Sequence, residues 1–397
     1  MGHLKFEHTQ PYENWFWTKN RIDLVFNRVE KVNTDHKELI FKDQSTLTYD
    51  ELVLATGSKP NLFGWKGQEL KGVGGLFSKQ DLDNMETYTH GIKRGVIVGG
   101  GLIGVEMAEM LLSRGIEVTF LVRESLFWGN VLPEQEAKLI MKHMKEHHVD
   151  LRLNTELDEI IGDENGRATA IKTVKGEVIE CGWVGLTAGV TPNIGFLSNS
   201  KIETNKGILV DEHFKTNIDN VYAIGDCAEF KKPVAGRRPV EQVWYTGKIM
   251  GKSLAKTLTG TPTSYAPGHW FNSAKFFDIE YQTYGWVFPT LKENEADFYW
   301  EHRNGKICIH LVFDRITREF IGINTFGIRM RHEAFDYYLR TKATVEYVVE
   351  HLKDANFDPE LYTTYEADIV AKFNEEEGTS LAVHEKKWSR ILNFFKQ

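Results

Sequence analysis

The chain has 397 residues, of which 41% are hydrophobic and 26% charged, and its formal net charge is -8. This length accommodates two or three domains, and the composition is that of an ordinary folded protein. The acidic balance offers no basic surface for nucleic acid, so we expect none to bind. No apolar run approaches the roughly 18 residues of a membrane span, and the N-terminus lacks a secretory pattern, which predicts a cytoplasmic protein.

The first predicted elements are short antiparallel strands around Ile22–Phe26 and Glu38–Phe41, on either side of a turn. A buried strand then begins near Tyr49 and ends at Thr56 and Gly57, before a proline stops regular structure. Ligands of α/β sheets bind at the carboxyl ends of strands, so this strand end is a candidate binding position.

The most informative segment, Gly95–Leu112, combines an apolar strand, a glycine-rich turn and an amphipathic helix. In such a unit Gly99 permits a sharp turn, Gly101 lets the backbone approach a pyrophosphate, and Gly104 lets the helix pack closely on the sheet. The pyrophosphate would lie at the helix N-terminus, next to Ile103. A glycine-rich turn that binds nothing is the alternative, and the apolar residues on both sides of the turn disfavour it.

The next predicted elements alternate between strand and helix as far as Cys181. They are a strand at Val118–Val122, a helix from Pro133 to about His147, and strands at Val149–Leu153, Ala168–Val174 and Glu177–Cys181. On the helix, His143 and His147 have a spacing that suits a metal ion. Lysine and glutamate residues surround them, so we expect a solvated helix face and no metal site.

A second glycine-ended strand, within Trp183–Asn193, repeats the Ala-Thr-Gly…Pro-Asn pattern of residues 55–61 and suggests two related crossings between domains. Further strands are predicted at Gly207–Asp211 and at Val221–Asp226, and a helix from Glu241 to about Leu258. Beyond Pro262 the strands become rich in aromatic residues, which indicates a separate domain.

Four motifs in this order resemble those of the FAD- and NAD(P)-dependent pyridine nucleotide-disulfide oxidoreductase superfamily. They are Ala55–Pro60, the turn from Gly99 to Gly104, Thr187–Asn193, which contains Gly189, and Thr216–Asp226. The run from Arg238 to Gly251 looks closest to the branch of ferredoxin reductases and apoptosis-inducing factor. The resemblance covers about residues 20–330.

The resemblance implies a role for several residues at an FAD site. Asp226, after Gly225, would accept a hydrogen bond from the ribityl chain, with a ligand-free helix cap as the alternative. Thr56 and Gly57 would contact the flavin through their backbone. Val240 and Glu241 would open a helix whose dipole favours reduced flavin, although Glu241 could equally be a plain first-turn acid.

The resemblance also concerns the nicotinamide cofactor. Glu106 would border the nicotinamide and place it against the flavin, unless it is only a solvated helix acid. At the end of the second strand Val122 stands where an acid would favour NAD, and Arg123 resembles an arginine that binds the 2′-phosphate of NADP. A second such arginine is missing, and Gly129 lies near its position. We therefore favour NADPH as the electron donor.

The chain begins in what resembles a later segment of the FAD domain, so the family's first βαβ unit is missing, and we attribute this to a truncated sequence. The predicted fold class is α/β. It comprises an incomplete FAD-binding domain (1–74 and 194–262), an NAD(P)-binding domain (75–193) and an α+β domain (263–397) with a helical tail. This last domain often supports dimerisation in the family. Within the tail, Trp388–Phe395 is expected to pack rather than to dock.

The sequence therefore predicts a flavin-dependent oxidoreductase that takes hydride from NAD(P)H and passes electrons to a redox protein or a small molecule. The alternative is an FAD-free NAD(P)-binding protein with a regulatory or inactive role. The three cysteines, Cys181, Cys227 and Cys308, form neither a redox pair nor a zinc ligand set. A redox cysteine in the missing segment remains open in this prediction.

Overall fold

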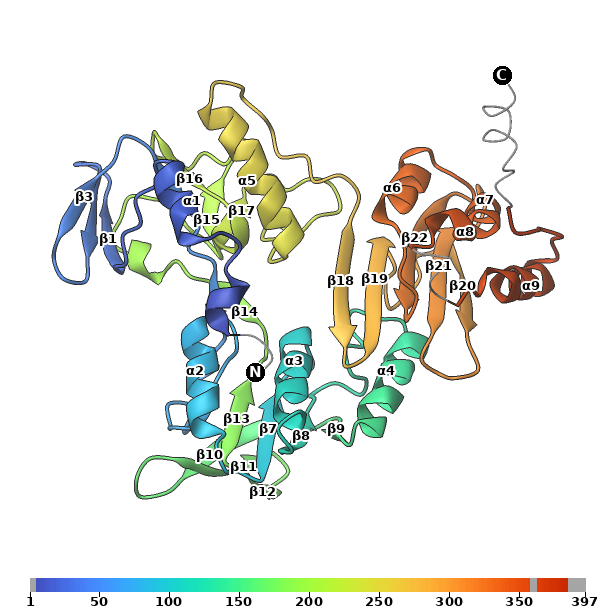
Figure 1. Cartoon of the computed structure of the whole chain (residues 1–397), viewed down its shortest axis with the longest axis horizontal. Helices are drawn as coiled ribbons and strands as arrows, with labels where there is room; N and C mark the ends of the chain where they lie inside the picture. The colour runs from blue at the N-terminus through green and yellow to red at the C-terminus, as the bar shows by residue number, and fades with distance from the viewer. Residues whose placement is uncertain (1–4, 358–362, 385–397) are drawn as a thin grey trace. The chain divides into compact units, whose positions relative to one another are not determined.

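The structure, a computed structural model, describes residues 5–357 and 363–384 (Figure 1). The predicted packing of Trp388–Phe395 lies outside the described residues. The chain divides into two compact units. Unit 1 contains Met1–Gly95, Glu159–Ile171 and Ile179–Pro267, and unit 2 contains Val96–Asp158, Lys172–Val178 and Gly268–Gln397.

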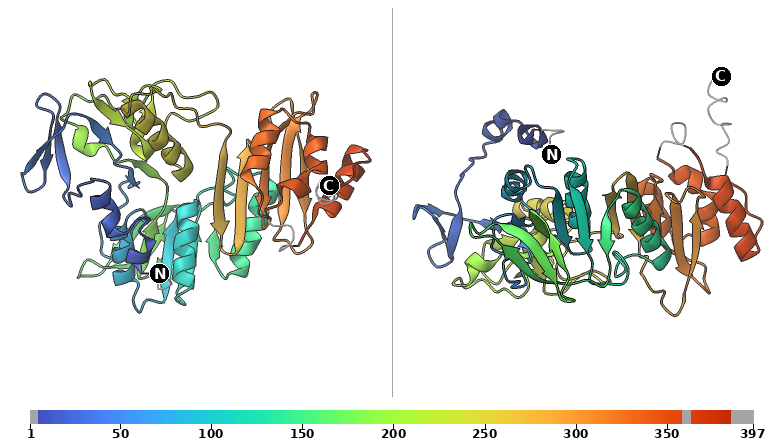
Figure 2. Two further views of the ribbon diagram at one scale, coloured as in Figure 1. Left: turned by 45° about the horizontal axis from the view of Figure 1, so that its top comes forward. Right: turned by 90° about the horizontal axis from the view of Figure 1, so that it is seen from below.

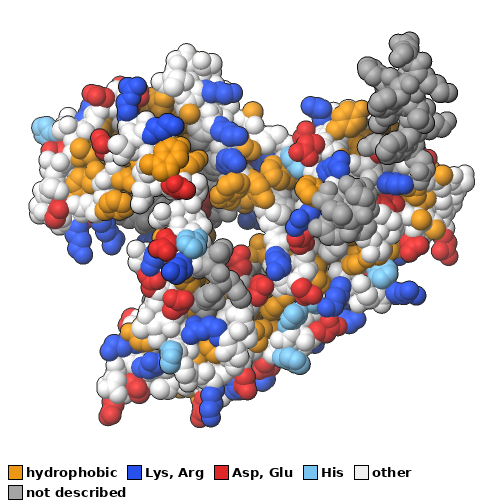
Figure 3. All heavy atoms as spheres, viewed as in Figure 1, with side chains coloured by type: hydrophobic (Ala, Val, Ile, Leu, Met, Phe, Trp, Pro, Cys, Tyr) orange, Lys and Arg blue, Asp and Glu red, His pale blue; other side chains and the backbone are white. Residues whose placement is uncertain are grey.

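Unit 1 begins with the short helices η1 (Phe6–Thr9) and α1 (Asn14–Lys19). An antiparallel sheet follows, in which β2 (Glu38–Phe41) lies between β1 (Val29–Asn33) and β3 (Thr46–Thr48). The predicted strand at residues 22–26 is wrong. Its apolar side chains have no sheet face to pack on, and Phe26 is 93% exposed. Hydrophobic side chains also lie at the surface on the face of the molecule in Figure 3.

Two parallel strand pairs form the core of unit 1. Strand β4 (Leu52–Leu54) pairs with β16 (Val221–Ala223), and β15 (Ile208–Val210) pairs with β17 (Ala228–Phe230). Helix α5 (Trp244–Leu258) adds Met250 and Leu254 to the same apolar cluster. The helix begins at Trp244, with Val243 as its N-cap, so the prediction that Val240 and Glu241 open it is wrong. Both residues lie in the preceding loop, which leaves the Glu241 side chain available for tertiary contacts.

The two glycine-ended motifs of unit 1 pair with each other. Strand β5 (Ser58–Pro60) runs antiparallel to β14 (Val190–Pro192), with Lys59 opposite Thr191. The short helices η2 (Gly195–Leu197) and η3 (Gly225–Cys227) follow β14 and β16 along the chain. The repeat in the sequence thus corresponds to a paired structure.

A five-stranded sheet has the order β6 (Val73–Gly74), β13 (Trp183–Leu186), β7 (Arg94–Val98), β8 (Glu117–Leu121), β9 (Asp150–Arg152). Its pairs β6–β13 and β8–β9 are parallel. Helix α2 (Lys79–Tyr88) starts with a capping box of Ser78 and Asp81, while α3 (Leu102–Leu112) and α4 (Glu134–Glu146) follow β7 and β8. Strands β10 (Leu157–Gly162), β11 (Ala168–Thr173) and β12 (Val178–Glu180) form a separate sheet.

The C-terminal part of unit 2 is an antiparallel five-stranded sheet in the order β18–β19–β22–β21–β20 (Figure 1). Its strands are drawn in shades of orange in both views of Figure 2. The strands are β18 (Phe271–Phe276), β19 (Ile279–Gly285), β20 (Glu295–Glu301), β21 (Cys308–Asp314) and β22 (Phe320–Phe326). The helices after it are α6 (His332–Arg340), α7 (Val345–Glu350), α8 (Leu352–Ala355) and α9 (Glu366–Glu377).

The antiparallel five-stranded sheet is covered on both faces. Ile309, Leu311 and Phe313 of β21 share a core with α6 to α9. Alternation along a strand turns His310 to the opposite face, where it meets Glu136 of α4. Both faces of β21 are therefore buried, which explains why nearly the whole strand is apolar.

Candidate functional site

The glycine-rich turn of unit 2 has the backbone that the sequence predicts. Gly99 has φ of 118°, which a side chain would disfavour, and its N–H donates to the Leu121 carbonyl at 3.1 Å. Gly101 is the N-cap of α3, and Gly104 is buried within its first turn. Gly101 carries no capping side chain, so the first N–H groups of the helix remain available to an anion.

Glu106 and Arg123 belong to the same unit as this turn. Glu106 is an exposed residue of α3, yet desolvation by its surroundings, and to a lesser degree the charge of Glu109, raise the pKa of its carboxyl. Arg123 follows β8 and is 72% exposed, and its guanidinium forms an ion pair with Glu124 at 2.9 Å. Arg123 therefore already has an acidic partner, Glu124, that a 2′-phosphate would have to displace. Ile103, beside Gly104 at the start of α3, is half-buried.

Asp226 of unit 1 is positioned by a chain of side-chain hydrogen bonds. Gly225, the residue before Asp226, has φ of 70°, and this conformation turns the backbone sharply after β16. The Asp226 Oδ2 accepts from Ser58 Oγ at 3.1 Å, and Ser58 Oγ accepts from Gln242 Nε2 at 2.7 Å. Burial raises the pKa of Asp226, and the Ser58 bond partly opposes this. Two segments far apart in the sequence thus fix one carboxylate.

Glu241 is a buried acid with an incomplete set of partners. Its Oε2 lies 3.5 Å from Arg237 Nη1 and accepts from Tyr265 OH at 3.1 Å. Its Oε1 is buried and has no hydrogen-bond partner. Burial raises the pKa of this carboxyl, which Arg237 opposes. An orphaned buried oxygen is costly, and a donor from a ligand would satisfy it. Val240 beside it is half-buried.

The paired motifs hold Thr56, Gly57 and Gly189 by reciprocal bonds. Thr56 Oγ1 donates to the Asn193 carbonyl at 2.9 Å, and the Asn193 N–H donates to the Gly57 carbonyl at 2.9 Å. The Asn61 N–H donates to the Gly189 carbonyl at 3.1 Å. Asn61 and Asn193, the two asparagines of the repeated Pro-Asn pattern, therefore each form a hydrogen bond with the other motif. These bonds rigidify the strand ends.

Sequence reasoning missed four residues of this site, namely Ser58, Gln242, Arg237 and Tyr265. Ser58 and Gln242 join the Asp226 carboxylate, while Arg237 and Tyr265 flank Glu241. Ser58 is adjacent to Gly57 in the first motif, and this adjacency could have indicated it. Gln242 lies within the run from Arg238 to Gly251, which could also have indicated it, while Arg237 and Tyr265 lie in segments without a recognisable pattern.

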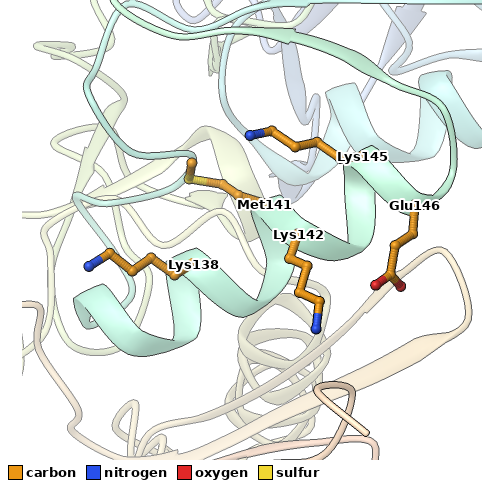
Figure 4. Close-up of a pocket in the computed structure, with 5 residues that line it drawn as sticks. All are labelled: Lys138, Met141, Lys142, Lys145 and Glu146. Carbon is orange, nitrogen blue, oxygen red and sulfur yellow. The ribbon is translucent and has the colours of Figure 1, made fainter.

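A separate hollow of unit 2 lies along α4 and has a volume of about 520 Å³ (Figure 4). It is lined by Lys138, Met141, Lys142, Lys145 and Glu146. This surface is basic, and none of the predicted site residues lines it. The same helix carries His143, which is not on a solvated face as the sequence suggested, because only 1% of it is exposed.

The residues present fit the cofactors that the sequence predicts. In unit 1, the orphaned oxygen of Glu241 and the half-buried carboxylate of Asp226 suit the hydroxyl and ring donors of a flavin nucleotide. In unit 2, the uncapped N-terminus of α3 suits a pyrophosphate. The fold and these sites define a class of nucleotide-binding α/β proteins.

Comparison with known proteins narrows this class to one family. The pyridine nucleotide-disulphide oxidoreductase family matches residues 5–250, more than half of the chain, and the chain belongs to this family. A nitrite reductase [NAD(P)H] of Bacillus subtilis is 30% identical over 243 residues, which are 61% of this chain and 30% of that protein. Rhodocoxin reductase of Rhodococcus erythropolis is 30% identical over 263 residues, 66% of this chain and 61% of that protein.

A solved structure of a ferredoxin reductase from Rhodopseudomonas palustris shares the fold, with a TM-score of 0.71 and 20% identity over 80% of this chain and 77% of that chain. These similarities confirm the predicted superfamily and the α/β fold class. The chain spans less than two thirds of the two relatives named above. Among the described residues no helix is long and apolar enough to cross a membrane.

Proposed function

We propose that this protein is an NAD(P)H-dependent flavoprotein oxidoreductase, in which unit 1 binds FAD and unit 2 binds the nicotinamide dinucleotide. The observation that carries the proposal is the hydrogen-bonded chain from Gln242 through Ser58 to Asp226. It fixes a carboxylate at a strand end, where α/β folds bind their ligands. The glycine turn of unit 2 supports the second half of the proposal.

In this proposal the protein's own residues bind and orient. Asp226 accepts hydrogen bonds from ribityl hydroxyls, and Ser58 keeps its carboxylate in place. Glu241 accepts a donor at its free Oε1, and Arg237 offsets its charge. Glu106 lies near the nicotinamide and orients it. FAD held by these residues would supply the hydride and electron-transfer chemistry that the protein's own side chains lack.

The electron acceptor is a small redox protein of the ferredoxin or rubredoxin type, or a small molecule. The names of rhodocoxin reductase and of the ferredoxin reductase from Rhodopseudomonas palustris support a protein acceptor. The resemblance of the C-terminal domain to the family's dimerisation domain supports a homodimer, and we propose that it acts in the cytoplasm. Sedimentation of the purified protein and fractionation of cells test these two points.

The donor is NADPH, on the strength of Arg123 at the end of β8. Because Arg123 is paired with Glu124, the preference is expected to be modest. The variant Arg123→Leu should raise KM for NADPH about tenfold, as the loss of one exposed charge-assisted contact implies, and leave KM for NADH unchanged. The variant Glu124→Gln should lower KM for NADPH. A much lower KM for NADH in the unmodified protein overturns the preference.

Flavin content and reductase activity test the proposal together. The protein, expressed from its natural locus, is purified and assayed for bound FAD and for reduction of ferricyanide by NADPH and by NADH. We expect about one FAD per chain, and in the Asp226→Ala variant a lower FAD content with a matching fall in activity. A protein that takes up no FAD but still binds NADPH would instead support the FAD-free alternative.

A further inference from the structure

Three side chains of unit 2 converge on a single point outside the proposed nucleotide sites. His143 and His147 lie one turn apart on α4, and Asp278 lies in the turn between β18 and β19. The Nε2 atoms of His143 and His147 lie 2.5 Å and 2.9 Å from the same oxygen, Asp278 Oδ1. All three ligand atoms lie within 4.8 Å of one another.

The imidazole ring of His143 is buried, and its nitrogens lack hydrogen bonds. It is 1% exposed, and although its Nε2 lies 2.5 Å from Asp278 Oδ1, neither ring nitrogen makes a hydrogen bond within the described residues. A buried polar group without a partner costs about 1–3 kcal/mol, so such a group requires an explanation. A metal ion between the imidazole and the carboxylate would supply one.

We propose that His143, His147 and Asp278 bind a zinc ion, with water as the fourth ligand. Zinc prefers imidazole nitrogen and carboxylate oxygen at about 2.0–2.2 Å in a tetrahedron, which separates neighbouring ligand atoms by about 3.3 Å. The present distances are slightly shorter, and small side-chain rotations would admit the ion. Two imidazoles in the set disfavour calcium and magnesium, which take oxygen ligands.

A neighbouring cation engages one of the two carboxylate oxygens of Asp278. The Lys306 Nζ lies 3.6 Å from Oδ2 of Asp278, which leaves Oδ1 for the ion.

Neighbouring side chains orient the two histidines. His147 stacks on Phe277, with ring centroids 4.5 Å apart and an interplanar angle of 9°. Glu146 Oε2 lies 3.7 Å from His143 Nδ1, the nitrogen that would face away from the metal. Figure 4 shows Glu146 projecting from the last turn of α4. A carboxylate beyond the ligating histidine is a common arrangement at zinc sites.

A second cluster, His351, Asp354 and His384, offers the same residue types, but its histidines already have hydrogen-bond partners. His351 Nδ1 pairs with the Tyr347 carbonyl at 2.8 Å, and His384 Nδ1 pairs with Asp354 Oδ2 at 3.2 Å. These contacts leave no buried nitrogen without a partner in the second cluster. It therefore serves as an internal comparison for the proposed zinc site.

Zinc titration of the full chain tests the proposal. The protein is dialysed against a chelator, and zinc chloride is added in competition with a chromophoric chelator, while the thermal midpoint is followed. We expect one zinc per chain and a rise in the midpoint. The variants His147→Ala and Asp278→Asn should bind zinc on the order of 100-fold more weakly, since loss of a ligand exceeds the effect of an outer partner.

Two matched variants complete the design. His148→Asn changes an exposed neighbour of the site at a positive φ that asparagine tolerates, and His384→Ala removes a member of the second cluster. Both should bind zinc like the unmodified chain. Circular dichroism confirms that each variant is folded. Absence of stoichiometric binding, unchanged binding in His147→Ala and Asp278→Asn, or loss of binding in His384→Ala overturns the proposal.

Discussion

Asp226 is the central residue of the proposed flavin site, because side chains from two distant segments hold its carboxylate in place. The first prediction concerns this residue. Asp226→Ala removes a charge-assisted acceptor worth about 1.5–3 kcal/mol, so FAD should bind about 10–100-fold more weakly. Quenching of flavin fluorescence measures the affinity. The control Asp219→Ala removes an exposed acid of the same unit and should leave the affinity unchanged. Equal affinities in the two variants would remove Asp226 from the site.

The three cysteines supply a second prediction at this scale. All three are buried free thiols, and burial raises the pKa of Cys181 to about 12 and also raises the pKa of Cys227. Because the thiolate is the reactive form, none should react quickly with an aromatic disulfide reagent at pH 8. In guanidinium chloride all three should react. One fast, stoichiometric thiol in the folded protein would contradict this account.

At the scale of elements, the N-terminus of α3 is expected to bind the pyrophosphate of the nicotinamide nucleotide. The third prediction compares two glycines with positive φ. Gly99→Ala and Gly115→Ala should each destabilise the fold by about 1–2 kcal/mol, since both place a side chain in the left-handed region. Only Gly99→Ala should weaken NADPH binding, measured by nucleotide fluorescence. Similar losses in both variants would separate the turn from binding.

Strand β21 buries an ionic network between its sheet and α4. His310 Nδ1 lies 3.0 Å from Glu136 Oε1, and His310 Nε2 pairs with Asp297 Oδ2 at 2.8 Å. Asn324, directly across from His310, donates to Glu136 Oε2 at 2.8 Å. Burial alone would lower the pKa of His310, but the two carboxylates outweigh it and raise the pKa to about 9.

The fourth prediction follows from this raised pKa. His310 binds its proton more tightly in the folded chain than in the unfolded chain, so its stabilising contribution is complete below about pH 6.5. The contribution is lost as the pH rises through about 9. The free energy of unfolding in urea should therefore fall over this window. His310→Gln should reduce this fall and His90→Gln, at an exposed site, should not. A fall of equal size in His310→Gln would contradict the assignment.

At the scale of the whole molecule, local patterns predict most elements but not their tertiary partners. The glycine turn, α3 and β8 follow from periodicity and spacing, and the structure agrees closely. The family also follows from four short motifs, and the comparisons confirm it. These features depend on neighbours in the sequence, which a sequence pattern records directly.

The errors arise where distant residues decide the outcome. The segment 22–26 has a strand-like pattern, yet no sheet face receives it. His143 has charged neighbours in sequence, but the turn with Phe277 and Asp278 buries it. The late start of α5 leaves Glu241 free to pair with Arg237. No local pattern contains these contacts, because each joins separate elements or depends on a helix boundary.

The most direct test of the central claim is the visible spectrum of the protein, expressed from its natural locus, before and after anaerobic addition of NADPH. The account predicts the absorbance of bound oxidised flavin and its bleaching by one equivalent of NADPH. A protein that carries no flavin and takes none up, or whose flavin neither NADPH nor NADH bleaches, would contradict it.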